Sequence, residues 1–179
     1  MPGSGFPEYA CLRLRKEYFI MENRKNDQKG FSLVELLVVV IIIAIVAAIA
    51  IPSLLASRRA ANEASAISSL RTVHSAQATY FATTGANLTY TGLATLGTEG
   101  LIDTVLAAGA KSGYNFTAVV GTPTSVYCAT AAPTSIGITG TGNRAFAVSQ
   151  PGVIFGVAGI APPTCTSTTG VITGGSPIE

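Results

Sequence analysis

The stretch KGFSLVELLVVVIIIAIVAAIAIP, residues 29–52, decides the fold, because it is a long apolar run interrupted by one acidic side chain, Glu35. Residues 31–51 would form a helix roughly 31 Å long at about 1.5 Å rise per residue. The hydrocarbon layer of a bilayer is about 30 Å thick. The β-branched residues at 38–43 favour a strand by propensity, but a lone strand cannot satisfy its backbone polar groups in lipid and a helix can. We therefore predict a membrane-spanning helix.

A secretory signal peptide is the alternative interpretation, since Ala56 lies in a loosely suitable cleavage context. Signal peptides have an apolar region of about 7 to 15 residues, and this run is longer. Basic residues at 24, 25 and 29 favour a cytoplasmic N-terminus, but Arg58 and Arg59 on the other side weaken that charge asymmetry.

Glu35 is the residue in the run that needs an explanation. A carboxylate at the bilayer centre costs about 2.5 to 3.5 kcal/mol on insertion scales, so an intramembrane acid is a functional hypothesis by default. The alternative is structural, because Glu35 lies only about 6 Å into the run at helical rise and could extend to the headgroups.

The composition indicates one modest domain with an anchor: 48% of the 179 residues are hydrophobic and 11% are charged. Residues 1–30 carry six basic and four acidic side chains, whereas the remaining residues carry five of each. No basic face is expected beyond the anchor, which argues against nucleic-acid binding.

The string from Lys29 to Leu37, KGFSLVELL, resembles the cleavage and methylation signature of type IV prepilins and pseudopilins. The resemblance implies that a prepilin peptidase cuts after Gly30 and methylates the new amine of Phe31. Glu35 is then the fifth residue of the mature chain. Pro52 would be its twenty-second residue, where many pilins carry a helix-bending proline.

The resemblance also gives Glu35 a partner. Cleavage creates an ammonium group on Phe31 in or near an apolar environment, and Glu35 of a neighbouring subunit could neutralise it. Opposite charges attract strongly at low dielectric, while either charge alone is penalised. We expect Glu35 and Pro52 to act in assembly.

The chain divides into four segments by these criteria. We expect a leader at 1–30, a hydrophobic membrane and assembly helix at 31–52, an amphipathic continuation at 53–84 and a globular part at 85–179. The leader is long for the family, and Met21 offers an alternative start with a ten-residue leader.

The segment after the anchor has apolar residues at three- and four-residue spacing, which predicts an amphipathic helix. Its alanines and lack of glycine support one continuous helix, and Gly85 is predicted as its C-cap. Pro52 should kink or loosen the helix locally.

A short helix is predicted over 98–109, followed by strands separated by Gly-, Pro- and Thr-rich turns. The predicted fold is α+β and pilin-like, with an antiparallel sheet packed on the long N-terminal helix. The tail at 161–179 is predicted to be a loop. The strands are expected from Tyr114, Thr124, Asn143 and Gly152.

Of the three cysteines, Cys11 precedes the anchor, whereas Cys128 and Cys165 follow it. If the membrane separates them, an oxidising exterior favours a disulfide between the last two. The alternative is two buried free thiols.

Candidates for catalysis and metal binding are few. Beyond Gly30 the chain has one histidine, His74, and one aspartate, Asp103. No catalytic triad, paired carboxylates or metal-ligand spacing can be built from them, so no catalytic residue, metal or cofactor is predicted. Type II secretion major pseudopilins bind calcium through acidic residues in a C-terminal loop, and that acidic set is missing here.

The resulting hypothesis is a structural protein, a type IV pilin precursor that forms a helical homopolymer. Its expected partners are the prepilin peptidase, the pilus assembly machinery and the inner membrane, with a cytoplasmic N-terminus before assembly and the cell surface afterwards. A pseudopilin, a minor pilin and a membrane-anchored ligand-binding β domain remain alternatives, and an enzyme is the least favoured.

Overall fold

The fold is described by a computed structural model, which covers residues 30–178. The chain divides into two units, with the boundary between residues 39 and 40. The predicted leader, the alternative start at Met21 and Cys11 lie outside the described residues.

The long helix predicted from the sequence is α1, Leu33–Ala82. It is continuous through Pro52, which therefore does not end the helix although it lacks a backbone donor. In the second unit, the buried face of α1 is formed by small and aliphatic residues three or four positions apart, chiefly Ala66, Leu70, Val73 and Ala76. The predicted amphipathic half is thus confirmed as the part that enters the core.

The predicted end of this helix was wrong. Its last residue is Ala82, and turns follow in which Gly85 N–H donates to Tyr80 O at 2.7 Å. The left-handed residues are Ala86 and Asn87, with φ of 50° and 59°, rather than Gly85. A Cβ on Gly85 would collide with the surrounding backbone, so this glycine is required for its small size.

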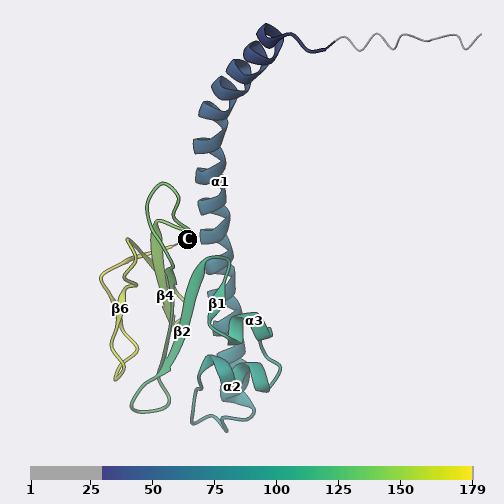
Figure 1. Cartoon of the computed structure of the whole chain (residues 1–179). Helices are drawn as coiled ribbons and strands as arrows, with labels where there is room; N and C mark the ends of the chain where they lie inside the picture. Colours follow the sequence, from purple (N-terminus) through teal and green to yellow (C-terminus); the bar gives the residue numbers. More distant parts are fainter. Residues whose placement is uncertain (1–29, 179) are drawn as a thin grey trace, which may run out of the picture. The chain divides into compact units, whose positions relative to one another are not determined.

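The antiparallel sheet confirms the predicted α+β class. Its order is β1-β2-β3-β4-β5-β8, and its four long strands match the predicted ones. Figure 1 labels β1, β2 and β4 of this sheet. The second of these long strands, β3, begins at Tyr127 rather than Thr124, because a turn with Val126 N–H donating to Pro123 O occupies the preceding residues. The strands of this sheet are β1 (Ala110–Lys111), β2 (Tyr114–Val120), β3 (Tyr127–Pro133), β4 (Arg144–Ser149), β5 (Ile154–Ala158) and β8 (Ser176–Pro177).

One sheet face packs on α1. Alternate strand positions point into a single hydrophobic core, as period-2 geometry requires. The register aligns Phe116, Ala131, Phe146 and Gly156 in a row across four strands, so that large and small residues alternate. This alternation lets two phenylalanine rings lie in one layer under α1.

Two short helices complete the core beside the C-terminal part of α1 (Figure 1). Helix α2, Leu93–Thr98, was not predicted, and the helix predicted over 98–109 shortens to α3, Thr104–Ala107. Asp103 begins α3 because its carboxylate accepts from Leu106 N at 2.6 Å.

The C-terminal segment is not the loop that was predicted. It forms a small hairpin of β6, Thr164–Cys165, with β7, Ile172–Thr173, and then adds β8 to the sheet edge. Ile178 N–H donates to Ile154 O at 2.8 Å, which extends this edge pairing. The chain end is therefore held by backbone hydrogen bonds.

Candidate processing and assembly site

The Gly30–Phe31 bond lies before the first turn of α1. Gly30 to Ser32 are not helical, and a Cβ built on Gly30 would meet no atom within 4 Å. Phe31 is 85% exposed. A peptidase could therefore reach this bond without unfolding the described part of the chain.

Glu35 lies in the first turn of α1 and is exposed. Leu36 N–H donates to Ser32 O at 3.1 Å, which closes the turn that carries Glu35. The unpaired N–H groups of a helix N-terminus favour a nearby carboxylate. Within residues 30–178 the Glu35 carboxylate makes no hydrogen bond or ion pair, so it is available to a group outside this chain.

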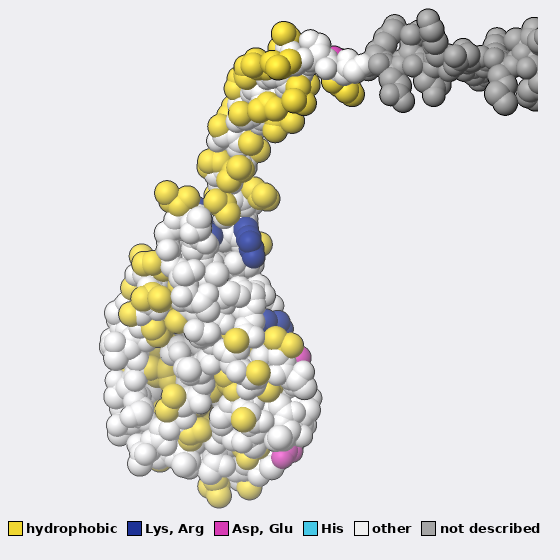
Figure 2. Space-filling view, in the orientation of Figure 1, with side chains coloured by type: hydrophobic (Ala, Val, Ile, Leu, Met, Phe, Trp, Pro, Cys, Tyr) yellow, Lys and Arg dark blue, Asp and Glu magenta, His cyan; other side chains and the backbone are white. Residues whose placement is uncertain are grey.

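The apolar half of α1 is exposed on all sides. Its large side chains from Leu33 to Leu54 are about half to four-fifths exposed, and none of its most apolar window is buried in the fold. Figure 2 shows hydrophobic side chains along the part of α1 that leaves the folded domain. Among the described residues, α1 is the one helix long and apolar enough to cross a membrane. An all-round apolar helix needs lipid or other helices around it.

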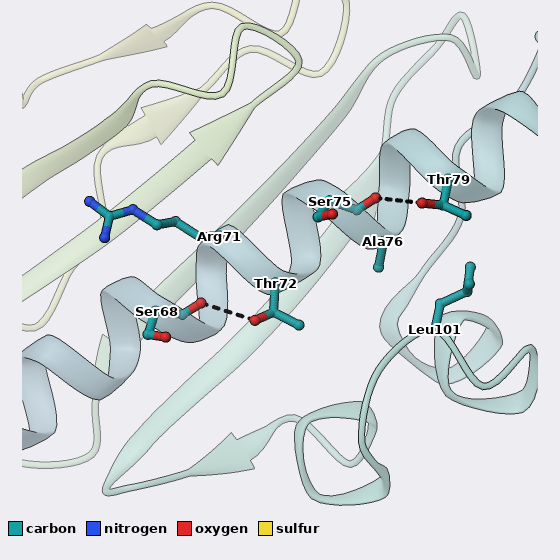
Figure 3. A pocket seen from close by; sticks show the side chains of 7 residues that line it. All are labelled: Ser68, Arg71, Thr72, Ser75, Ala76, Thr79 and Leu101. Carbon is teal, nitrogen blue, oxygen red and sulfur yellow. Dashed lines mark hydrogen bonds between the residues drawn. The ribbon is translucent and has the colours of Figure 1, made fainter.

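A hollow of about 400 Å³ lies along the amphipathic half of α1 (Figure 3). The hydroxyls of Thr72 and Thr79 donate to carbonyls one turn earlier, those of Ser68 and Ser75. Arg71 is the one charged side chain among its lining residues. This lining offers neither an acid–base pair nor a nucleophile with a base beside it.

His74 is half-buried and contacts the sheet. Its Nδ1 lies 2.6 Å from the Tyr127 hydroxyl, which also lies 3.4 Å from Ser149 O. Burial raises the pKa of Tyr127, with a smaller contribution from Tyr90. The hydroxyl therefore stays protonated and joins His74 to a strand, as expected of a structural histidine.

Cys128 and Cys165 form a disulfide in the structure, with Cα atoms 6.3 Å apart. It joins β3 in the sheet to β6 in the C-terminal hairpin. The sequence favoured this pairing only because both cysteines follow the anchor and would share an oxidising compartment. The structure adds that the two cysteines lie close together.

The polar contacts that attach the sheet to α1 were missed by sequence analysis. Glu63 accepts from Asn143 N at 2.8 Å and from Arg144 Nε at 2.9 Å, and Asn62 donates to Thr141 O at 2.9 Å. Arg59 donates to Gly137 O at 3.2 Å. The partners lie about eighty positions apart in sequence, so no local pattern could indicate them.

Residues 30–178 contain no group of three His, Cys, Asp or Glu side chains that could hold a metal ion. The described site therefore consists of the exposed Gly30–Phe31 bond, a carboxylate without a partner among residues 30–178 and an exposed apolar helix.

The family model described as the prokaryotic N-terminal methylation motif matches residues 25–51. The comparisons with curated proteins and with solved structures give no match. The matched residues include the Gly30–Phe31 bond, Glu35 and most of the exposed apolar helix. The chain thus carries the type IV prepilin signal, which marks a type IV pilin-like or pseudopilin precursor.

Proposed function

We propose that this chain is a structural subunit of a type IV pilus. Prepilin peptidase cleaves after Gly30 and methylates Phe31, and the mature subunits polymerise through the apolar half of α1. The observation that supports this most directly is Glu35, which has no partner among residues 30–178 and lies five positions after Gly30 on an exposed apolar helix, inside the matched motif.

Glu35 has a definite role in this proposal. The amine of Phe31 is the charge that cleavage creates, and Glu35 of a neighbouring subunit neutralises it in an apolar surrounding. Either charge alone would be costly there, so the pair favours a register in which both are satisfied. Pro52 acts in assembly by removing one backbone hydrogen-bond donor from the packed helix.

Before assembly, the subunit is held in the inner membrane by α1 with its N-terminus on the cytoplasmic side. Afterwards it belongs to a filament on the cell surface. The pilus assembly machinery is its further partner, and the protein itself has no enzymatic activity. Proteins with this motif are structural subunits, which supports this assignment.

Two measurements test the proposal. Mass spectrometry of the mature chain should find an N-methylated Phe31, and an intact Gly30–Phe31 bond in a cell with active prepilin peptidase would refute the processing. Glu35→Gln should be inserted and cleaved normally but should give far fewer filaments by electron microscopy. The matched control is Glu99→Gln, which removes another exposed carboxylate outside the apolar helix. Normal filaments from Glu35→Gln would refute the role of this carboxylate.

A further inference from the structure

The β3–β4 loop, residues 134–143, carries two exposed isoleucines. Ile136 is 53% exposed and Ile138 is 76% exposed. We call these two side chains the isoleucine tip. They are among the larger apolar side chains that the second unit exposes outside α1, and the core uses neither of them.

The isoleucine tip belongs to a closed turn. Thr141 N–H donates to Ser135 O at 2.9 Å, and Gly140 N–H donates to Gly137 O at 3.0 Å. A Cβ on Gly140 would collide with Ile136, so the turn is packed against its own backbone. Because the loop is internally bonded, it presents both isoleucines outward in a fixed arrangement.

Contacts with α1 set the position of this loop along the helix. Arg59 Nη1 lies 3.2 Å from Gly137 O and 3.2 Å from Asn143 Oδ1. Arg59 follows Leu54, the last strongly exposed aliphatic residue of the run, by about 7.5 Å at helical rise. The isoleucine tip is therefore held within about two turns of the end of the apolar helix.

The exposed charged side chains of α1 near the isoleucine tip are basic. Arg58 is exposed, and Arg59 lies beside the loop. The acidic side chain nearest in sequence, Glu63, is buried and paired with Arg144. Figure 2 shows Lys and Arg side chains where the hydrophobic part of α1 meets the folded domain. Two adjacent arginines beside apolar side chains suit the phosphate and upper acyl region of a bilayer.

We propose that the isoleucine tip, together with Arg58, contacts the outer surface of the inner membrane before assembly. Arg58 interacts with lipid phosphates while Ile136 and Ile138 enter the headgroup boundary, so that the folded domain is supported on the bilayer at a second point. This inference rests on the membrane anchoring in the proposed function. It also gives a role to Arg58 and Arg59, which follow the anchor and weaken the charge asymmetry that would orient the helix in the membrane.

The test uses the full chain with Cys11→Ser and one added thiol carrying an environment-sensitive fluorophore, labelled without reductant. The thiol is introduced by Ile138→Cys at the tip, by Ile45→Cys inside the anchor, or by Leu88→Cys as the control. Leu88 is 68% exposed but follows the far end of α1. Each protein is placed in vesicles of phosphatidylethanolamine and phosphatidylglycerol, with and without acyl chains brominated near the headgroup.

Brominated lipid should lower the emission at Ile138→Cys about twofold, since interfacial groups lie about 5–10 Å into the headgroup boundary. Leu88→Cys should be unaffected, and Ile45→Cys should be quenched. Adding Ile136→Asp to the Ile138→Cys protein should return its emission toward that of the Leu88→Cys control. Because both isoleucines are exposed, this change does not disturb the core.

Two results would overturn the inference while leaving the anchoring intact. One is quenching at Ile45→Cys without quenching at Ile138→Cys. The other is an emission shift at Ile138→Cys that disappears when the protein is diluted in lipid, because a second copy then covers the tip. If Ile45→Cys is itself not quenched, the membrane anchoring of the proposed function fails, and this inference fails with it.

Discussion

Arg144 Nε donates to Glu63 Oε2 at 2.9 Å, which joins the first residue of β4 to the middle of α1. The other carboxylate oxygen of Glu63 accepts from Asn143 N at 2.8 Å. One buried side chain thus fixes the end of the β3–β4 loop and the start of the next strand on the helix.

Glu63→Ala should lower the free energy of unfolding by about 2 kcal/mol, because it leaves two donors without their acceptor. The Arg144 side chain is half exposed, so water can hydrate it when Glu63 is removed. The loss of stability is therefore smaller than for a fully buried ion pair. Urea denaturation of the detergent-solubilised chain, followed by tyrosine fluorescence, measures the change. Glu99→Ala is the control and should be nearly neutral. An equal loss in both variants would contradict the role of Glu63.

Gln77→Leu should also destabilise the protein, by about 2 to 3 kcal/mol, although leucine is similar in size and apolar. Gln77 is fully buried, and its amide pairs with both backbone groups of Thr91, with Nε2 2.5 Å from Thr91 O. The substitution leaves that N–H and that carbonyl unsatisfied. Hydrogen exchange should show loss of protection at the Thr91 amide, and Thr79→Ala on the exposed face should leave it unchanged. Unchanged protection in Gln77→Leu would refute this reading.

Removing the disulfide with the double substitution Cys128→Ser and Cys165→Ser should cost about 4 kcal/mol in the chain-entropy model for a separation of 37 residues. The loss should be concentrated in the hairpin of β6 and β7. Limited proteolysis should therefore cleave near residues 159–170 before it cleaves the sheet. Cleavage that begins in β2 or β3 would show that the disulfide supports the sheet instead.

The pKa of Asp103 should lie below its ordinary value, because Lys111 Nζ donates to its carboxylate at 2.6 Å and Leu106 N–H donates as well. A depressed folded-state pKa means that the stabilisation is present above the ordinary carboxyl pKa and is lost as the pH falls through the folded value. Lys111→Met should move the Asp103 midpoint upward in an NMR carboxyl titration. An unchanged Asp103 midpoint in Lys111→Met would contradict this interpretation.

The sequence predicted the features that arise from local periodicity. The three- and four-residue spacing around Leu70 and Val73 predicted the amphipathic half of α1, and the Gly-, Pro- and Thr-rich turns between short runs predicted the four long strands. The proposed processing residues came from a short motif, which can be recognised without knowing the fold. These are properties that a window of ten to thirty residues contains.

Features that depend on distant partners were not predicted. The left-handed residues that follow the end of α1 at Ala82 are not glycines, so the prediction of Gly85 as the C-cap was wrong. Strand β8 has no alternation of its own and exists because β5 offers an open edge. The buried hydrogen bonds of Gln77 were not predicted, since its partner at Thr91 depends on a turn after the helix.

The continuity of α1 has a mechanical consequence. In the second unit, the segment that leaves the folded domain and the segment buried in its core are the same helix, with no intervening loop. A pull along that axis therefore loads the contacts at Asn62, Glu63 and Gln77 in shear, together rather than one after another. A domain attached in this way resists extraction with the combined strength of its whole helix–sheet interface.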